Sequence, residues 1–295
     1  MKRIKELPTD LGSRSLTELC RDWENQYHYG SVARRAQREA LWAPYYSMVY
    51  RGQAEQPFSL PEEPGSVTKV LLEEEVLTRE TDALEIGCGG GALALDLARY
   101  CRSVTALDLN PEAIRLVSER CAQTDSSNLH PVLSSWNEET PTDRYSLVIS
   151  AMCPAVCNLE ALTAMEAAGK VCALVTVMRG SYDKYRSKMM QELGLQPEGM
   201  ITEAQMYLDL LQALGRKPKV WTESIHSTRQ TSLESLLAQF PTYFAIFGIQ
   251  SEESERYLRD FFARHQEGGF LQDETQMNRA LILWYPQSTE EGESR

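Results

Sequence analysis

A glycine run next to an acidic residue, with a second acid further along, is the feature of the sequence best suited to chemistry: Leu84-Glu85-Ile86-Gly87-Cys88-Gly89-Gly90-Gly91-Ala92, with Asp108 following 21 residues after Gly87. Glycines let the backbone turn sharply and let a ligand approach it closely. A helix that starts behind such a turn presents unpaired N–H groups. An acid at the end of the next strand can hold the hydroxyls of a ribose. The pattern therefore predicts a nucleoside-containing cofactor at the carboxyl edge of a parallel sheet.

The glycine spacing leaves two kinds of nucleoside cofactor open. Gly87, Gly89 and Ala92 satisfy the pattern G-x-G-x-x-G/A of dinucleotide-binding turns, so a nicotinamide cofactor is one alternative. Glu85 favours the other, because a pyrophosphate gains nothing from an anion two residues before the turn. A cofactor with a cationic amino or sulfonium group does gain from it.

The elements that must position these residues alternate between short apolar runs and helical stretches from residue 82 onward, which is typical of a parallel α/β sheet. Strands are expected at residues 83–86, 103–107, 130–133, 145–149, 171–177, 219–225 and 279–285. Helices are expected at residues 90–102, 110–121, 159–168 and 202–214. The predicted fold class is α/β, with a seven-stranded, mostly parallel sheet and helices on both of its faces.

Two further helical parts are expected around this sheet. Residues 1–64 have no strand pattern and predict an N-terminal helical cap, broken near Tyr29 and again at Pro44. Residues 65–286 form the predicted cofactor domain, which carries a helical insertion at about 229–276, before the last strand. Residues 287–295 are a polar tail.

Composition limits the ligand classes. The chain has 295 residues, 42 % of them hydrophobic, and a net charge of −12, which disfavours nucleic acid and anionic membrane surfaces as partners. The longest apolar stretch, residues 171–178, is far shorter than the roughly 20 residues that span a bilayer. The odd number of cysteines, seven, predicts free thiols and a cytoplasmic location. No metal site is expected, since Cys153 and Cys157 lack a second ligand pair, and we expect a monomer or a homodimer.

Three segments resemble the class I, Rossmann-like S-adenosylmethionine-dependent methyltransferases. Residues 84–91 resemble the first motif of that family, residues 106–113 the second, and residues 145–150 the fourth-strand motif that ends beside the methyl donor. The resemblance covers residues 65–180 well and the first 60 residues not at all. It implies S-adenosylmethionine as cofactor and S-adenosylhomocysteine as product.

The resemblance also implies which residues hold the cofactor. The turn with Gly87, Cys88, Gly89 and Gly91 would pass under the methionine part, and Glu85 would sit near the amino group. Asp108 would bind the ribose, Leu109 would lie beside the adenine, and Ser150 would end the strand beside the methyl group. At the end of the third strand the family usually has an acid or an amide. This chain has Ser135 and Trp136 there, which we assign to the adenine edge.

Residues for the methyl acceptor are predicted from position and aromatic content. The substrate candidates are Tyr27, Tyr46, Met152, Cys153 and Tyr243, and the candidates for a catalytic role are Tyr29 and His28. The expected reaction is in-line methyl transfer to a small-molecule acceptor. An NAD(P)-dependent oxidoreductase and a non-catalytic S-adenosylmethionine-binding protein are the alternatives.

Overall fold

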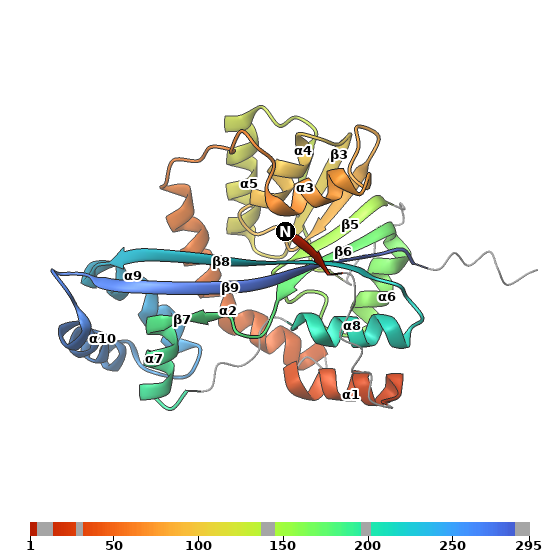
Figure 1. Ribbon diagram of the computed structural model, residues 1–295. Coiled ribbons are helices and arrows are strands. Elements are labelled where there is room, and N and C mark those ends of the chain that lie inside the picture. Colours follow the sequence, from red (N-terminus) through yellow and green to blue (C-terminus); the bar gives the residue numbers. More distant parts are fainter. Residues whose placement is uncertain (5–13, 28–31, 137–144, 196–201, 287–295) are drawn as a thin grey trace, which may run out of the picture.

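The computed structural model describes residues 1–4, 14–27, 32–136, 145–195 and 202–286 (Figure 1). Within these residues, no helix is both long enough and apolar enough to cross a bilayer.

Five parallel strands form the part of the sheet that carries the glycine turn. Their spatial order is β4-β3-β2-β5-β6, and neighbouring strands are parallel throughout. The strands are β2 (Asp82–Ile86), β3 (Ser103–Asp108), β4 (Leu129–Leu133), β5 (Tyr145–Ala151) and β6 (Gly169–Val177). The apolar side chains of β2, β3, β5 and β6 are mostly buried on both faces, as expected for a sheet covered by crossover helices, whereas Val132 and Leu133 of the edge strand β4 are exposed.

The other edge of the sheet is antiparallel. β9 (Leu271–Trp284) pairs with β6, β8 (Lys219–Thr231) pairs with β9, and β1 (Lys2–Ile4) pairs with β8. The short β7 (Tyr182–Asp183) pairs with β9. The described chain therefore forms nine strands, and the prediction of seven was too low. β1 and β7 are too short to show an alternating pattern, so only their pairing defines them as strands.

Helices cover both faces of the sheet, as predicted (Figure 1). One hydrophobic cluster joins the sheet to α3 (Ser66–Glu73), α4 (Ala92–Ala98) and α5 (Pro111–Thr124). The opposite cluster joins it to α1 (Leu16–Tyr27), α6 (Leu159–Ala168) and α8 (Ala204–Ala213). Asn110 caps α5 by accepting the N–H of Glu112, and Pro111 occupies the first helical position, as the sequence predicts.

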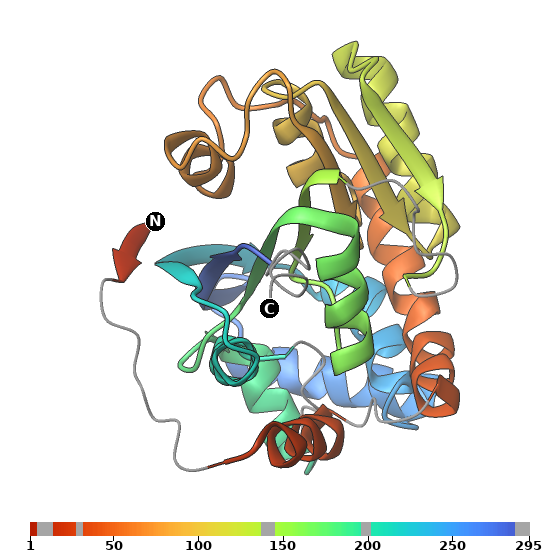
Figure 2. The same ribbon diagram turned by 90° about the vertical axis from the view of Figure 1, so that its right-hand side faces the viewer.

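Helix α2 (Val32–Ala54) runs past the carboxyl ends of the parallel strands (Figure 2). It continues through Pro44, so the predicted break there was wrong. A proline removes one helical hydrogen bond, but aromatic contacts of Trp42 and Tyr45 with Tyr243 of α9 (Leu233–Ala245) hold this part of the helix in place.

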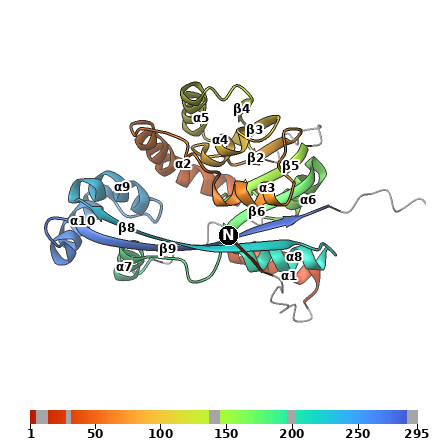
Figure 3. The ribbon, with the colours of Figure 1, turned by 45° about the horizontal axis from the view of Figure 1, so that its top comes forward.

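The second helical part is carried by a long two-stranded arm, formed where β8 and β9 extend beyond the sheet (Figure 3). β8 is six residues longer than predicted and β9 seven. Residues 224–230 of β8 are exposed, and neither extension shows an alternation of apolar residues. The predicted pair of helices follows at the tip as α9 and α10 (Ser251–His265). These pack with α7 (Lys184–Glu192) into a third hydrophobic cluster, which Trp42 and Tyr45 of α2 join.

Candidate functional site

Backbone hydrogen bonds join the glycine turn after β2 to the end of β3. Gly87 and Cys88 both donate their N–H groups to the carbonyl of Leu107, at 2.7 and 2.9 Å. Gly87, with φ of 71°, also lies against the segment after β5: a Cβ built on it would stand 2.0 Å from Sγ of Cys153. The turn therefore needs glycine here both for its backbone angle and for the space that Cys153 occupies.

Asp108 joins the turn to the end of β3. Its Oδ2 accepts the N–H of Gly89 and its Oδ1 accepts the N–H of Asn110, each at 2.8 Å. Burial raises the pKa of this carboxyl, and the backbone N–H groups of Asn110, Gly89 and Leu109 partly oppose the rise. The side chain thus lines the cleft while holding two loops at once.

Glu85 is a buried acid whose hydrogen bonding is incomplete. It is 2 % exposed, and within the described residues its Oε2 has no hydrogen-bond partner. Burial raises its pKa well above the ordinary value, the charge of Asp108 adds to the rise, and the N–H of Ala94 opposes it. A buried carboxylate oxygen without a donor destabilises the protein until a donor or a cation reaches it.

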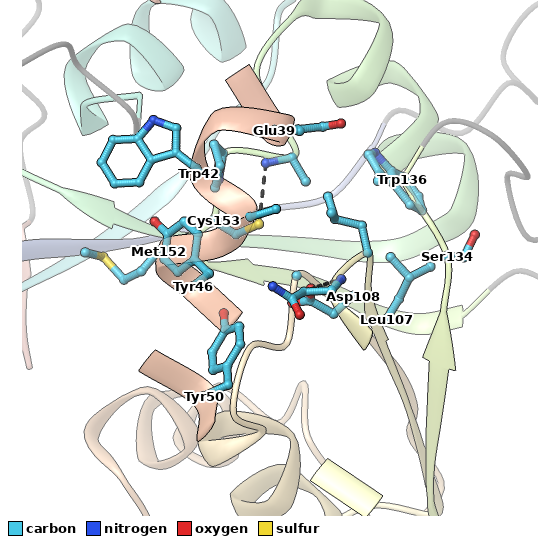
Figure 4. Close-up of a pocket in the computed structure, with 16 residues that line it drawn as sticks. Glu39, Trp42, Tyr46, Tyr50, Leu107, Asp108, Ser134, Trp136, Met152 and Cys153 are labelled. Atoms are coloured by element: carbon cyan, nitrogen blue, oxygen red, sulfur yellow. Dashed lines mark hydrogen bonds between the residues drawn. The ribbon is translucent and has the colours of Figure 1, made fainter. Parts of the chain in front are cut away.

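A cleft opens between the carboxyl ends of the strands and α2 (Figure 4). It holds about 900 Å³ of empty space, open solvent at its mouth included. Its lining residues come from α2, from the glycine turn and from the ends of β3, β4 and β5: Glu39, Trp42, Ala43, Tyr46, Tyr50, Gly87, Leu107, Asp108, Leu109, Asn110, Ser134, Trp136, Met152, Cys153, Pro154 and Ala155. Within the described residues, no Lys, Arg or His lines it.

One face of α2 forms the wall opposite the strands. Glu39, Trp42, Tyr46 and Tyr50 follow one another at intervals of three or four residues, so a single helical face presents them all. The rings of Trp42 and Tyr46 are 5.8 Å apart, and those of Tyr46 and Tyr50 stack at 6.2 Å. Glu39, Trp42 and Tyr50 were absent from the sequence-based site, although this helical periodicity was available to find them.

The strand side of the cleft is mostly apolar. Sγ of Cys153 accepts the N–H of Ala155 at 3.4 Å, and burial raises the pKa of this thiol to about 12. Trp136 donates its ring N–H to the carbonyl of Ala161 at 3.2 Å and is 3 % exposed. Cys153 is therefore a neutral thiol at physiological pH, and Trp136 serves the hydrophobic core as well as the cleft wall.

The structure brings together seven of the residues predicted for the site as lining residues of the cleft: Tyr46, Gly87, Asp108, Leu109, Trp136, Met152 and Cys153. Others stand outside the lining. Ser150 donates its hydroxyl to the carbonyl of Ile86 at 3.1 Å and so joins β5 to β2. Tyr243 lies behind Trp42, with ring centroids 5.9 Å apart.

The remaining predicted residues fall into three groups. Glu85, Cys88, Gly89, Gly91 and Ser135 are close in sequence to lining residues without lining the cleft themselves. Tyr27 ends α1, and its side chain is outside the description. His28 and Tyr29, the candidates for catalysis, lie outside the described residues.

Part of this site lies in a segment that matches a known protein family. Residues 83–173, from β2 into β6, match the model of the methyltransferase domain family. Among curated proteins, nodulation protein S of Sinorhizobium fredii is 31 % identical over 71 residues, which are 24 % of this chain and 32 % of that protein. The match thus spans about a third of the length of this relative.

Solved structures share the fold at low identity. The protein YjhP from E. coli aligns with a TM-score of 0.50 and 10 % identity, over 83 % of this chain and all of YjhP. An S-adenosylmethionine-dependent methyltransferase from Aquifex aeolicus aligns with a TM-score of 0.44 and 13 % identity, over 74 % of this chain and 89 % of its own. Coclaurine N-methyltransferase, bound to N-methylheliamine and S-adenosylhomocysteine, aligns with a TM-score of 0.44 and 15 % identity, over 93 % and 96 % of the two chains.

Proposed function

We propose that the chain is a class I S-adenosylmethionine-dependent methyltransferase, with S-adenosylmethionine as its cofactor, and that it transfers the methyl group to a small-molecule acceptor, because residues 83–173 match the methyltransferase domain family. The observation that carries this proposal is the cleft between α2 and the carboxyl ends of the strands. Its lining is mostly apolar and aromatic, with a few polar groups such as Asp108 and Asn110, as is usual for small-molecule sites, and α2 closes the side opposite the strands.

The residues of the turn and of the strand ends fit the cofactor. The buried Oε2 of Glu85, which has no hydrogen-bond partner among the described residues, suits a cationic amino group that would supply a donor. Asp108 lines the cleft and suits the ribose hydroxyls, and the exposed side chain of Leu109 suits the adenine. A pyrophosphate would bring further negative charge to these two acids, so the nicotinamide alternative is set aside.

The acceptor side of the cleft is the aromatic wall of α2 and the segment after β5. Trp42 and Tyr46 line the cleft together with the apolar residues Met152, Pro154 and Ala155. A flat, mostly apolar acceptor suits these surfaces. With no basic residue among the described lining and with Glu39 present, a neutral or cationic acceptor is favoured over an anionic one.

The cofactor brings an activated methyl group, so the protein mainly has to align the acceptor and exclude water. Holding the reacting atoms about 3–3.5 Å apart and in line can contribute up to ~7–11 kcal/mol. Cys153 stays protonated and is no base, and burial beside Asp108 also keeps the Tyr50 phenol neutral by raising its pKa. An acceptor that arrives with a free electron pair needs no base from this wall.

The test is where the methyl label goes. Purified protein is incubated with methyl-tritiated S-adenosylmethionine and cell extract, and the extract is then divided at about 1 kDa. We expect label in a small-molecule product that chromatography separates from unreacted S-adenosylmethionine, and much less of this product with Asp108→Ala. Label in protein or nucleic acid would contradict the proposal. Tight binding of S-adenosylhomocysteine without any transfer would favour the non-catalytic alternative.

We also infer a reducing compartment, the cytoplasm, as the location. None of the seven cysteines, all of which lie in described parts of the chain, is in a disulfide. Fractionation of cells that express the tagged chain tests this, and enrichment in an oxidising compartment would contradict it.

A further inference from the structure

Tyr50 of α2 presents a hydroxyl to the cleft next to the glycine turn. We propose that this hydroxyl donates a hydrogen bond to the α-carboxylate of S-adenosylmethionine, so that α2 completes the cofactor site. The inference rests on the cofactor assignment given above. It assigns a role to a helix that lies outside the matched domain, residues 83–173.

The backbone of the turn has few donors left for a carboxylate. The N–H groups of Gly87 and Cys88 donate to Leu107, that of Gly89 donates to Asp108, and that of Gly91 donates to the carbonyl of Cys88. Four of the five residues from 87 to 91 thus use their N–H groups inside the protein. A carboxylate above this turn needs donors from elsewhere.

Within the described residues no positively charged side chain lines the cleft, so none can donate to the carboxylate. The buried guanidinium of Arg120 does reach the turn, where Nη1 donates to the carbonyl of Gly90 at 2.5 Å. It packs on the ring of Phe58 at 4.2 Å and does not line the cleft. The carboxylate is therefore left with neutral side-chain donors.

Tyr50 is a neutral hydroxyl donor that both lines the cleft and lies against the turn. A Cβ built on Gly89 would stand 3.2 Å from the Tyr50 oxygen. Within the described residues the structure records no hydrogen bond for this hydroxyl, and Figure 4 shows it directed into the cleft between Tyr46 and Asp108. Ser134, another lining hydroxyl, already donates to the carbonyl of Ser135 at 3.3 Å.

The protonation state and the anchoring of Tyr50 support this role. Burial, and then the charge of Asp108, raise the pKa of the phenol, so it keeps the proton that a carboxylate would accept. One residue further along, Arg51 forms an ion pair with Glu112 of α5 at 2.9 Å. Ser47 hydrogen-bonds the side chain of Asn110. These contacts hold Tyr50 over the turn before any ligand arrives.

The test compares two ligands that differ only in the carboxylate. Dissociation constants of S-adenosylmethionine and decarboxylated S-adenosylmethionine are measured by calorimetry for the wild type and for Tyr50→Phe. We expect Tyr50→Phe to weaken S-adenosylmethionine about 10-fold or more, as for a charge-assisted hydrogen bond. It should leave the decarboxylated ligand within about twofold, so that the preference for the carboxylate nearly disappears.

Tyr46→Phe is the matched control, because it removes a phenol hydroxyl one turn earlier on the same face, and it should keep the preference for the carboxylate. Equal weakening of both ligands by Tyr50→Phe would show that the hydroxyl serves the ribose or Asp108 instead, and unchanged binding would place the carboxylate elsewhere. Either result overturns the inference and leaves the cofactor assignment standing. That assignment fails only if the wild type binds neither ligand.

Discussion

Asp108 and Gly89 are joined by a hydrogen bond of 2.8 Å that ties the end of β3 to the turn after β2. The other carboxylate oxygen accepts the N–H of Asn110, which is the N-cap residue of α5. The residue predicted to bind the ribose is therefore also the one that fixes the floor of its site. Binding and local stability are coupled at this position.

Replacing Asp108 should separate these two roles. Asp108→Ala leaves two buried N–H groups without an acceptor, and we expect a loss of roughly 1–3 kcal/mol in the free energy of unfolding. Binding of S-adenosylhomocysteine should weaken about 10-fold or more. Asp108→Asn keeps one acceptor oxygen, so it should lose less stability but still lose affinity.

Calorimetry and thermal unfolding measure the two quantities. Asp125→Asn, at an exposed left-handed position at the end of α5, is the control and should change neither. Wild-type affinity in Asp108→Ala would remove Asp108 from the cofactor site.

Glu85→Gln should act in opposite directions on stability and on binding. The pKa of Glu85 is raised in the folded protein, so between the ordinary value of 4.5 and the raised value the folded state holds a proton that the unfolded state has lost. The ligand-free protein therefore loses stability as the pH rises through this window. The glutamine variant has no carboxyl group to titrate at this position and so does not lose stability in this way. Its free energy of unfolding relative to the wild type should therefore increase between pH 5 and pH 8.

The same substitution removes the charge that would meet the cofactor's amino group, so the thermal shift caused by S-adenosylmethionine at pH 8 should shrink. Unfolding curves at both pH values, with and without ligand, measure this. Glu80→Gln, an exposed substitution just before β2, should show neither change. A ligand-free Glu85→Gln protein that is less stable than the wild type at pH 8 would contradict the argument.

Gly87→Ala tests how tightly the turn packs on Cys153. The new Cβ would meet Sγ at 2.0 Å and the Cys153 Cβ at 2.8 Å, on a backbone with φ of 71°. A left-handed backbone costs a non-glycine residue roughly 1–2 kcal/mol, and overpacking adds roughly 1–3 kcal/mol. We expect loss of stability through both effects, together with weaker binding of S-adenosylhomocysteine.

Gly194→Ala separates the two contributions, because Gly194 has φ of 63° with nothing within 4 Å of its would-be Cβ. It should lose only the backbone part. The double variant Gly87→Ala/Cys153→Ala should recover some stability through removal of Sγ. If chemical denaturation shows equal losses for Gly87→Ala and Gly194→Ala, the contact with Cys153 is unimportant.

Arg51→Ala should loosen α2 without unfolding the protein. Arg51 pairs with Glu112 across two helices, whereas Arg115 pairs with the same acid from within α5. Arg51→Ala should speed the dissociation of S-adenosylhomocysteine several-fold and make it less dependent on salt, with little change in melting temperature. Arg115→Ala, which keeps the link between the helices, is the control, and stopped-flow measurements of dissociation compare the two. Equal dissociation rates in both variants would show that this ion pair does not hold α2 over the cleft.

Much of the fold was predictable because it depends on local patterns. The parallel strands and α6 lie within two residues of their expected bounds, since buried strands and capped helices show in composition and spacing. The outer halves of β8 and β9 were missed because their mostly polar residues show no apolar alternation. The continuation of α2 through Pro44 was missed because the contact between Trp42 and Tyr243 joins residues about 200 positions apart in the sequence.

The sequence by itself determined the part of the candidate site that we assign to the cofactor. The glycine turn, Glu85 and Asp108 are close along the chain, and a strand, a turn and a helix suffice to relate them. Only the tertiary structure decided which residues lie opposite the glycine turn. Tyr50 lies against Gly89 and Cys153 lies against Gly87, and among the residues that the structure describes one oxygen of Glu85 has no partner. All three features result from long-range packing that has no local pattern. The physical reason is that helix periodicity shows which residues share a face, whereas the surface that this face meets depends on how the rest of the chain packs.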